Sequence, residues 1–114
     1  MVIEDDQALC YIYEKVLEKF DIELIQASDG AIAIEILRDT VPDVIFLDIL
    51  LPRISGLDVL QFIADHRPLV NSSVIVVTAN PRFEAEVRRI HPVEFVAKPI
   101  MPDRIRACVT NSVV

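Results

Sequence analysis

The chain has 114 residues, of which 53% are hydrophobic and 25% are charged, and its net charge is −7. This length suits one domain, the apolar fraction argues against disorder, and the negative charge argues against direct nucleic acid binding through phosphates. No apolar run reaches the roughly 18 residues of a membrane span, and no signal peptide is recognisable. We therefore expect a cytoplasmic protein that does not enter a membrane, with Cys10 and Cys108 as buried, reduced thiols.

The first part of the chain alternates short apolar runs with amphipathic stretches. Apolar residues recur at helical spacing between Leu9 and Phe20, with charged residues between them. Asp6 is assigned as the cap of this helix, and the turn Ser28-Asp29-Gly30 contains a cap for the next one. The elements predicted here are a strand at residues 2–3, a helix over 9–20, a strand over 23–27, a helix from about 33 to 39 and a strand that ends at Asp48.

The second part of the chain continues this alternation. The run from Val74 to Val77 is apolar without interruption, which favours a strand covered on both faces. His66 and His91 stand at predicted helix ends without a second metal ligand, so we interpret both as surface or capping residues. The elements predicted here are a helix over 56–66, a strand over 74–78, a short helix over 83–90, a strand over 93–97 and a helix that begins near Pro102.

Five strands that alternate with five helices imply right-handed crossovers and a parallel sheet. The pattern predicts an α/β fold: a flavodoxin-like, doubly wound, five-stranded parallel sheet with strand order 2-1-3-4-5 and helices on both faces. We assign residues 1–114 to a single domain. The first strand is shorter than the roughly five or six residues of most strands, so either N-terminal residues are missing or the strand is short.

Asp48 is the most informative residue of the chain. It follows the apolar run from Val44 to Leu47, and a carboxylate at the end of a buried strand costs free energy unless a charged or hydrogen-bonding group meets it. In open α/β sheets, that end of a strand is where ligands bind. Asp48 is therefore either a nucleophile or ligand in an active crevice, or a cap at the end of its strand.

Polar residues also follow the other strands that neighbour it in the predicted order. Glu4 and Asp5 follow the first strand, Thr78 ends the fourth, and Lys98 follows the fifth. Clustered carboxylates repel each other unless a cation lies among them, and oxygen-only ligands select a hard ion such as Mg²⁺ or Mn²⁺. Lys98 adds a positive charge and Thr78 a hydrogen-bond donor. Together they could bind the oxygens of a phosphoryl group during its transfer to Asp48.

Five segments, in this order and spacing, resemble the receiver domain of two-component response regulators, including the chemotaxis regulator. The segments span nearly the whole chain. They are Val2–Asp6, Ala27–Gly30, Asp43–Pro52 with Gly56, Val76–Ala79 and Phe95–Pro99.

The resemblance implies a phosphoacceptor and a metal site. Asp48 would accept the phosphoryl group, Asp5 would bind Mg²⁺ directly, and Glu4 would act through water. The backbone carbonyl of Leu50 would be a further metal ligand beside Asp48. Asp29 receives no chemical role.

The resemblance also implies a switch. Thr78 would hydrogen-bond the phosphoryl group, Lys98 would form an ion pair with it, and Phe95 would be the aromatic residue that turns inward. The peptide bond before Pro99 is expected to be cis. Considered singly, Thr78 is an ordinary strand residue, Lys98 an ordinary surface lysine, and Phe95 is more often a core residue than a switch.

The function implied by the resemblance is that of a signalling phosphoacceptor, which catalyses only its own phosphorylation and self-dephosphorylation. Its donor would be a histidine kinase or a histidine phosphotransfer protein, and its output would pass through the fourth helix, fifth strand and fifth helix to an output domain or downstream protein. Pairing of two copies through the last helices is compatible with the sequence. An unphosphorylated protein-binding module is the alternative. A haloacid-dehalogenase-type phosphohydrolase would need a second Asp where Leu50 stands.

Two features depart from the family pattern. Residues 80–92 contain Pro81 and Pro92 but no glycine, which predicts a stiff loop and a short fourth helix within the output surface. Leu50, two positions after the acceptor, is apolar and cannot orient a hydrolytic water. We therefore expect slow self-dephosphorylation.

Overall fold

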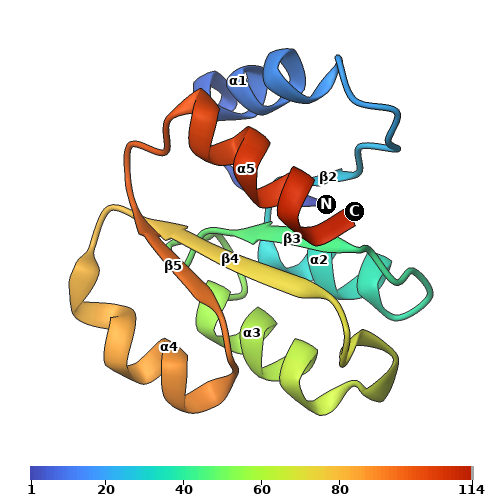
Figure 1. The fold of residues 1–114 in the computed structure, drawn as a ribbon. Coiled ribbons are helices and arrows are strands. Elements are labelled where there is room, and N and C mark those ends of the chain that lie inside the picture. The colour runs from blue at the N-terminus through green and yellow to red at the C-terminus, as the bar shows by residue number, and fades with distance from the viewer. Residues whose placement is uncertain (114) are drawn as a thin grey trace.

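The computed structural model describes residues 1–113, which form a five-stranded parallel sheet flanked by helices (Figure 1). The strand order is β2-β1-β3-β4-β5, so the predicted flavodoxin-like order is confirmed. The strands are β1 (Val2–Ile3), β2 (Gln26–Ala27), β3 (Val44–Leu47), β4 (Ser73–Thr78) and β5 (Glu94–Ala97). The helices are α1 (Gln7–Leu17), α2 (Gly30–Leu37), α3 (Gly56–Asp65), α4 (Glu84–Ile90) and α5 (Pro102–Val113), with 3-10 turns at Arg67–Leu69 and Pro81–Phe83.

Helices cover both faces of the sheet, as predicted. In Figure 1, α1 and α5 lie on one face, and α2, α3 and α4 lie on the other. On the first face the ring of Tyr13 packs against that of Phe46, with centroids 5.1 Å apart. On the second face Leu47 and Leu60 are fully buried in one cluster. Each such side chain contributes about 2 kcal/mol by leaving water, which explains why β3 and β4 read as continuous apolar runs.

Side-chain caps fix where the first three helices begin. Asp6 accepts hydrogen bonds from the backbone of Ala8 at 2.9 Å and of Leu9 at 3.4 Å, which confirms its assignment as the cap of α1. Asp29 caps α2, and Ser55 caps α3. Each cap is worth about 1 kcal/mol, because it satisfies backbone N–H groups in the first turn of its helix.

The second strand is shorter than predicted. Only Gln26–Ala27 is strand, where the sequence predicts residues 23–27. Its partner β1 has two residues, Val2 and Ile3, which pair with Gln26 and Ala27. Residues 23–25 therefore have no strand partner, apart from one hydrogen bond that the backbone N–H of Val2 donates to the carbonyl of Ile25 at 2.8 Å.

Other boundaries differ from prediction by a few residues. α1 ends at Leu17 rather than near residue 20, and α2 ends at Leu37 rather than near 39. After Leu37 the backbone of Asp39 bonds to Ile36, three residues back, so the helix tightens and stops. β5 begins at Glu94 and not at residue 93. None of the described helices combines the length and the apolar character needed to cross a membrane.

Candidate functional site

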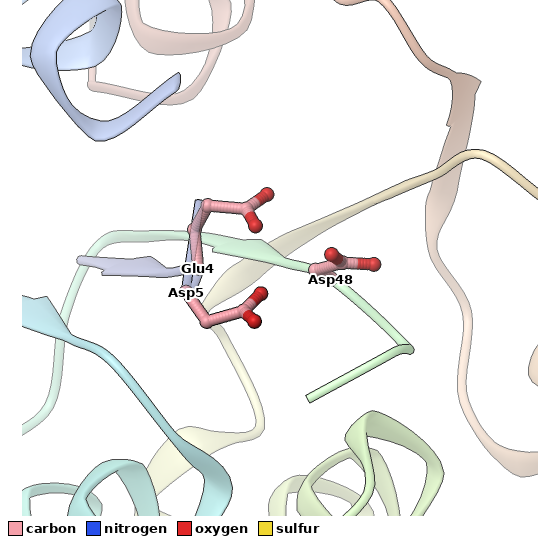
Figure 2. Close-up of side chains that lie close together, drawn as sticks. All are labelled: Glu4, Asp5 and Asp48. Atoms are coloured by element: carbon pink, nitrogen blue, oxygen red, sulfur yellow. The ribbon is translucent and has the colours of Figure 1, made fainter. Parts of the chain in front are cut away.

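Three carboxylates meet at the C-terminal ends of β1 and β3. Ligand oxygens of Glu4, Asp5 and Asp48 all lie within 4.8 Å of one another. The cause is the parallel register: Ile3 pairs with Leu47, so the residues that follow the two strands emerge side by side. Figure 2 shows the three side chains extending into the same space. Glu4 and Asp48 are 3% and 5% exposed, whereas Asp5 is open to solvent.

Lys98 joins two of these carboxylates. Its Nζ lies 2.9 Å from Oε1 of Glu4 and 2.9 Å from Oδ2 of Asp48. The backbone N–H of Lys98 donates to the carbonyl of Thr78 at 2.8 Å, which continues the pairing of β4 with β5. The peptide bond between Lys98 and Pro99 is cis. The ammonium thus contacts both buried carboxylates and offsets part of their negative charge.

Burial raises the pKa of Glu4 to about 7, although hydrogen bonds from Lys98 and from the backbone of Asp6 oppose this rise. The charge of Asp48 adds to the rise in the pKa of Glu4. Burial by itself would lower the pKa of Lys98, but its hydrogen bonds to the carboxylates of Asp48 and Glu4 outweigh this effect, and the pKa of Lys98 is raised. The ammonium therefore stays charged, and one lysine leaves the carboxylates short of positive charge. An oxygen-only donor set of this kind fits a hard divalent cation.

Asp48 is also held by backbone groups of the loop that follows it. Its Oδ1 accepts a hydrogen bond from the N–H of Leu50 at 3.1 Å. A Cβ on Gly56 would lie 2.2 Å from the backbone oxygen of Asp48, so only glycine allows α3 to start this close to Asp48. The Leu50 side chain is 54% exposed and so does not fill the core.

Thr78 and Phe95 lie on neighbouring strands beside the carboxylates. Thr78 is fully buried at the end of β4, and its hydroxyl accepts a hydrogen bond from the backbone of Asn80 at 3.4 Å. Phe95 pairs with Val76 across β4 and β5, is half-buried, and packs against the core cluster on the side of α4. The structure therefore brings Glu4, Asp5, Asp48 and Lys98 into contact distance and places Phe95 on the adjoining edge strand.

Two contacts near the site have no marker in the sequence. Cys10 is half-buried rather than buried, and its thiol donates to the backbone carbonyl of Glu4 at 3.4 Å; Cys108 is buried, and both thiols are free. Asp29, for which no chemical role was expected, accepts two hydrogen bonds from Arg53 in the loop after Asp48. The sequence does not reveal this pair, because the two residues are 24 positions apart and Asp29 stands in an ordinary turn sequence. The path of the loop has to be known first.

Comparisons with known proteins give one consistent result. The model of the response regulator receiver domain family matches residues 1–110. The luminescence regulatory protein LuxO of Vibrio campbellii is 32% identical over 114 residues, which are 98% of this chain and 25% of LuxO. The polar-differentiation response regulator DivK of Brucella ovis is 31% identical over 106 residues, which are 91% of this chain and 86% of DivK.

A solved structure shares the fold. The receiver domain of the sensor histidine kinase PA1611 of Pseudomonas aeruginosa, with a magnesium ion coordinated in its active-site cleft, aligns with a TM-score of 0.86 at 18% identity. The alignment covers 97% of this chain and 93% of that one. The chain spans about a quarter of the length of LuxO but most of DivK.

Proposed function

The chain belongs to the response regulator receiver domain family of two-component signalling, and from this premise we propose that Asp48 is its phosphoacceptor. One observation carries the proposal: a nearly buried carboxylate, at the end of a central strand, is paired with Lys98 and lies beside two further carboxylates. A cap at the end of a strand needs neither of these. The donor would be a histidine kinase or a histidine phosphotransfer protein.

The proposed reaction is a direct transfer between the donor and this carboxylate. An oxygen of Asp48 attacks the phosphorus of a phosphohistidine, a P–O bond forms, and the P–N bond breaks as the imidazole leaves with its electron pair. Lys98 already holds one oxygen of Asp48 at 2.9 Å, and its charge offsets the negative charge that arrives with the phosphoryl group. The N–H of Leu50 keeps the other oxygen in a fixed orientation.

The metal site would use the same edge of the sheet. We assign Asp5 and Asp48 as direct ligands, Glu4 as a ligand through water, and the backbone carbonyl of Leu50 as a further ligand. Bound Mg²⁺, or Mn²⁺, would supply positive charge to the phosphoryl oxygens. Support comes from the carboxylate cluster and from the magnesium ion in the cleft of the PA1611 receiver domain, whose fold this chain shares.

The switch would run from Thr78 to Phe95. Thr78 would leave its bond to the backbone of Asn80 for the phosphoryl group, and Phe95 would turn inward beside it. The half-buried state of Phe95 on an edge strand supports this role. The output would pass through α4, β5 and α5 to an output domain or a downstream protein in the cytoplasm. We treat residues 1–114 as one receiver domain.

The exposed side chain of Leu50 sets the expected lifetime of the acyl phosphate. Because it has no polar group to orient water at the phosphoryl group, self-dephosphorylation is slow. Leu50→Asn is expected to shorten the lifetime about tenfold, which is less than a general base contributes, because an amide can orient water but cannot take its proton. Phosphate release after removal of the donor measures it, and an unchanged lifetime would count against this role of Leu50.

Intact-mass spectrometry with acetyl phosphate tests the main proposal. The expected result is an adduct of one phosphoryl group that requires Mg²⁺, is lost in Asp48→Asn, and persists in Asp43→Asn at the other end of the same strand, where the carboxylate is exposed. No adduct on the unmutated chain would reject the proposal and favour an unphosphorylated binding module.

A further inference from the structure

The loop between β3 and α3, residues 49–55, carries the Leu50 carbonyl that we assign to the metal. The N–H of Leu50 donates to the Asp48 side chain at 3.1 Å, and the N–H of Gly56 donates to the carbonyl of Ile49 at 2.8 Å, which ties the two ends of the loop together. The Leu50 side chain cannot anchor the loop, because it is 54% exposed. Leu51 and Ile54 pack against the core cluster, so the turn between them, at Pro52 and Arg53, is the part of the loop that needs another attachment.

That attachment is to the start of α2. A Cβ on Gly30 would lie 2.0 Å from the backbone oxygen of Ile54, so the loop rests directly on the first turn of this helix. The N–H of Gly30 points to the carbonyl of Pro52 at 3.5 Å, which is a long hydrogen bond. The short contacts come from one side chain: Nε and Nη2 of Arg53 lie 3.0 Å and 2.7 Å from Oδ2 of Asp29.

Asp29 is a firm anchor for this arginine. Its Oδ1 accepts the N–H of Ile32 at 2.9 Å and caps α2, while its Oδ2 is used for Arg53. The bond from Ile32 lowers the pKa of Asp29, and Arg53 lowers it further, so the carboxylate stays charged. α2 is itself fixed to the sheet by Ala33 and Leu37, which are fully buried.

The backbone of Arg53 indicates that its side chain has a task. Arg53 has a φ of 65°, and among residues 1–113 no other residue that is not glycine has a positive φ. Residues other than glycine, asparagine and aspartate are disfavoured at this backbone conformation, so glycine would fit the turn with less strain. The guanidinium, in contrast, provides the two-pronged contact that glycine lacks.

We propose that Arg53 is a positioning residue for the metal site, which it serves through its ion pair with Asp29. The pair ties the acceptor loop to α2 and so keeps the Leu50 carbonyl in place for a divalent cation. This inference rests on the proposed function, because the metal role of Leu50 belongs to it. It differs from the ordinary role of an exposed ion pair, which is a small addition to stability.

The test separates positioning from stability. In Arg53→Gly, relief of the positive φ opposes the added entropy of the unfolded chain, so the metal-free Tm stays close to that of the unmutated protein. The Mg²⁺ Kd, measured by calorimetry, is expected to rise about tenfold, as for other residues that orient a metal ligand. In metal-free protein, amides of residues 50–54 exchange hydrogen faster.

Two further variants complete the experiment. Asp29→Asn keeps the helix cap but removes the charge, so it should weaken Mg²⁺ binding less than Arg53→Gly does. Arg88→Ala breaks an exposed ion pair of α4 and should leave Mg²⁺ binding unchanged. Unchanged Kd and unchanged exchange in Arg53→Gly would overturn the inference, provided the unmutated protein binds Mg²⁺. If the unmutated protein binds none, the proposed metal site itself is rejected.

Discussion

The acceptor edge is the end of the sheet where the proposed acceptor Asp48 meets Glu4, Asp5 and Lys98. This edge and the α4 segment, residues 79–92, are built in opposite ways although they lie on neighbouring parts of the same fold (Figure 1). At the acceptor edge, Glu4 and Asp48 are nearly buried and share Lys98. In α4, a helix of 7 residues, only Val87 is buried. Segments with few buried contacts open at lower free energy than the core. The contrast suggests a fixed centre for chemistry beside a segment that can change its arrangement at little cost.

The largest difference between the two regions should appear when their backbones are perturbed. Gly56→Ala places a Cβ 2.2 Å from the backbone oxygen of Asp48, so strand or helix must move. We expect a loss of about 3 kcal/mol or more in the free energy of unfolding, measured with urea. The matched change in the other region, Ala85→Gly in exposed α4, should cost about 1 kcal/mol or less. Equal costs at the two sites would break the comparison.

A second difference concerns pH. Burial raises the pKa of Glu4 from 4.5 to about 7, so the folded protein retains a proton there that the unfolded chain has released. The stabilisation that Glu4 itself contributes to the metal-free protein should therefore be fully present below pH 4.5 and be lost as pH rises through 7, by up to about 3 kcal/mol.

Glu4→Gln removes this titration. Urea unfolding at several pH values in the absence of metal should show a shallower decline between pH 4.5 and 7 than in the unmutated protein. Glu86→Gln, on exposed α4, is the control and should retain the original slope. Parallel curves for Glu4→Gln and the unmutated protein would show that burial of Glu4 does not govern this range.

The smallest effect is expected within α4 itself. Arg88 pairs with Glu84 at 3.0 Å, and its Nη1 donates to the carbonyl of Val93 at 3.1 Å. Both side chains of the pair are about half exposed, so Arg88→Ala should cost less than about 1 kcal/mol in urea unfolding. A loss as large as that of Gly56→Ala would mean that α4 is as firmly held as the acceptor edge.

The sequence predicts the acceptor edge better than its surroundings, for physical reasons. β3 and β4 are continuous apolar runs, and parallel strands place all their C-terminal ends on one edge, so Asp48 and Lys98 are expected at the same edge of the sheet. The extent of β2 depended on the two-residue length of its partner β1. The contact between Asp29 and Arg53 depended on the path of a loop with a positive φ, which no periodicity records.

Hydrogen exchange of the phosphorylated and unphosphorylated protein tests the central claim most directly. Acetyl phosphate and Mg²⁺ would be added to the unmutated chain, with Asp48→Asn treated in the same way as the control. The account predicts changed exchange over residues 79–97, which include α4 and β5, while β1 and β3 keep their protection. A fully phosphorylated protein with unchanged exchange over residues 79–97 would contradict it.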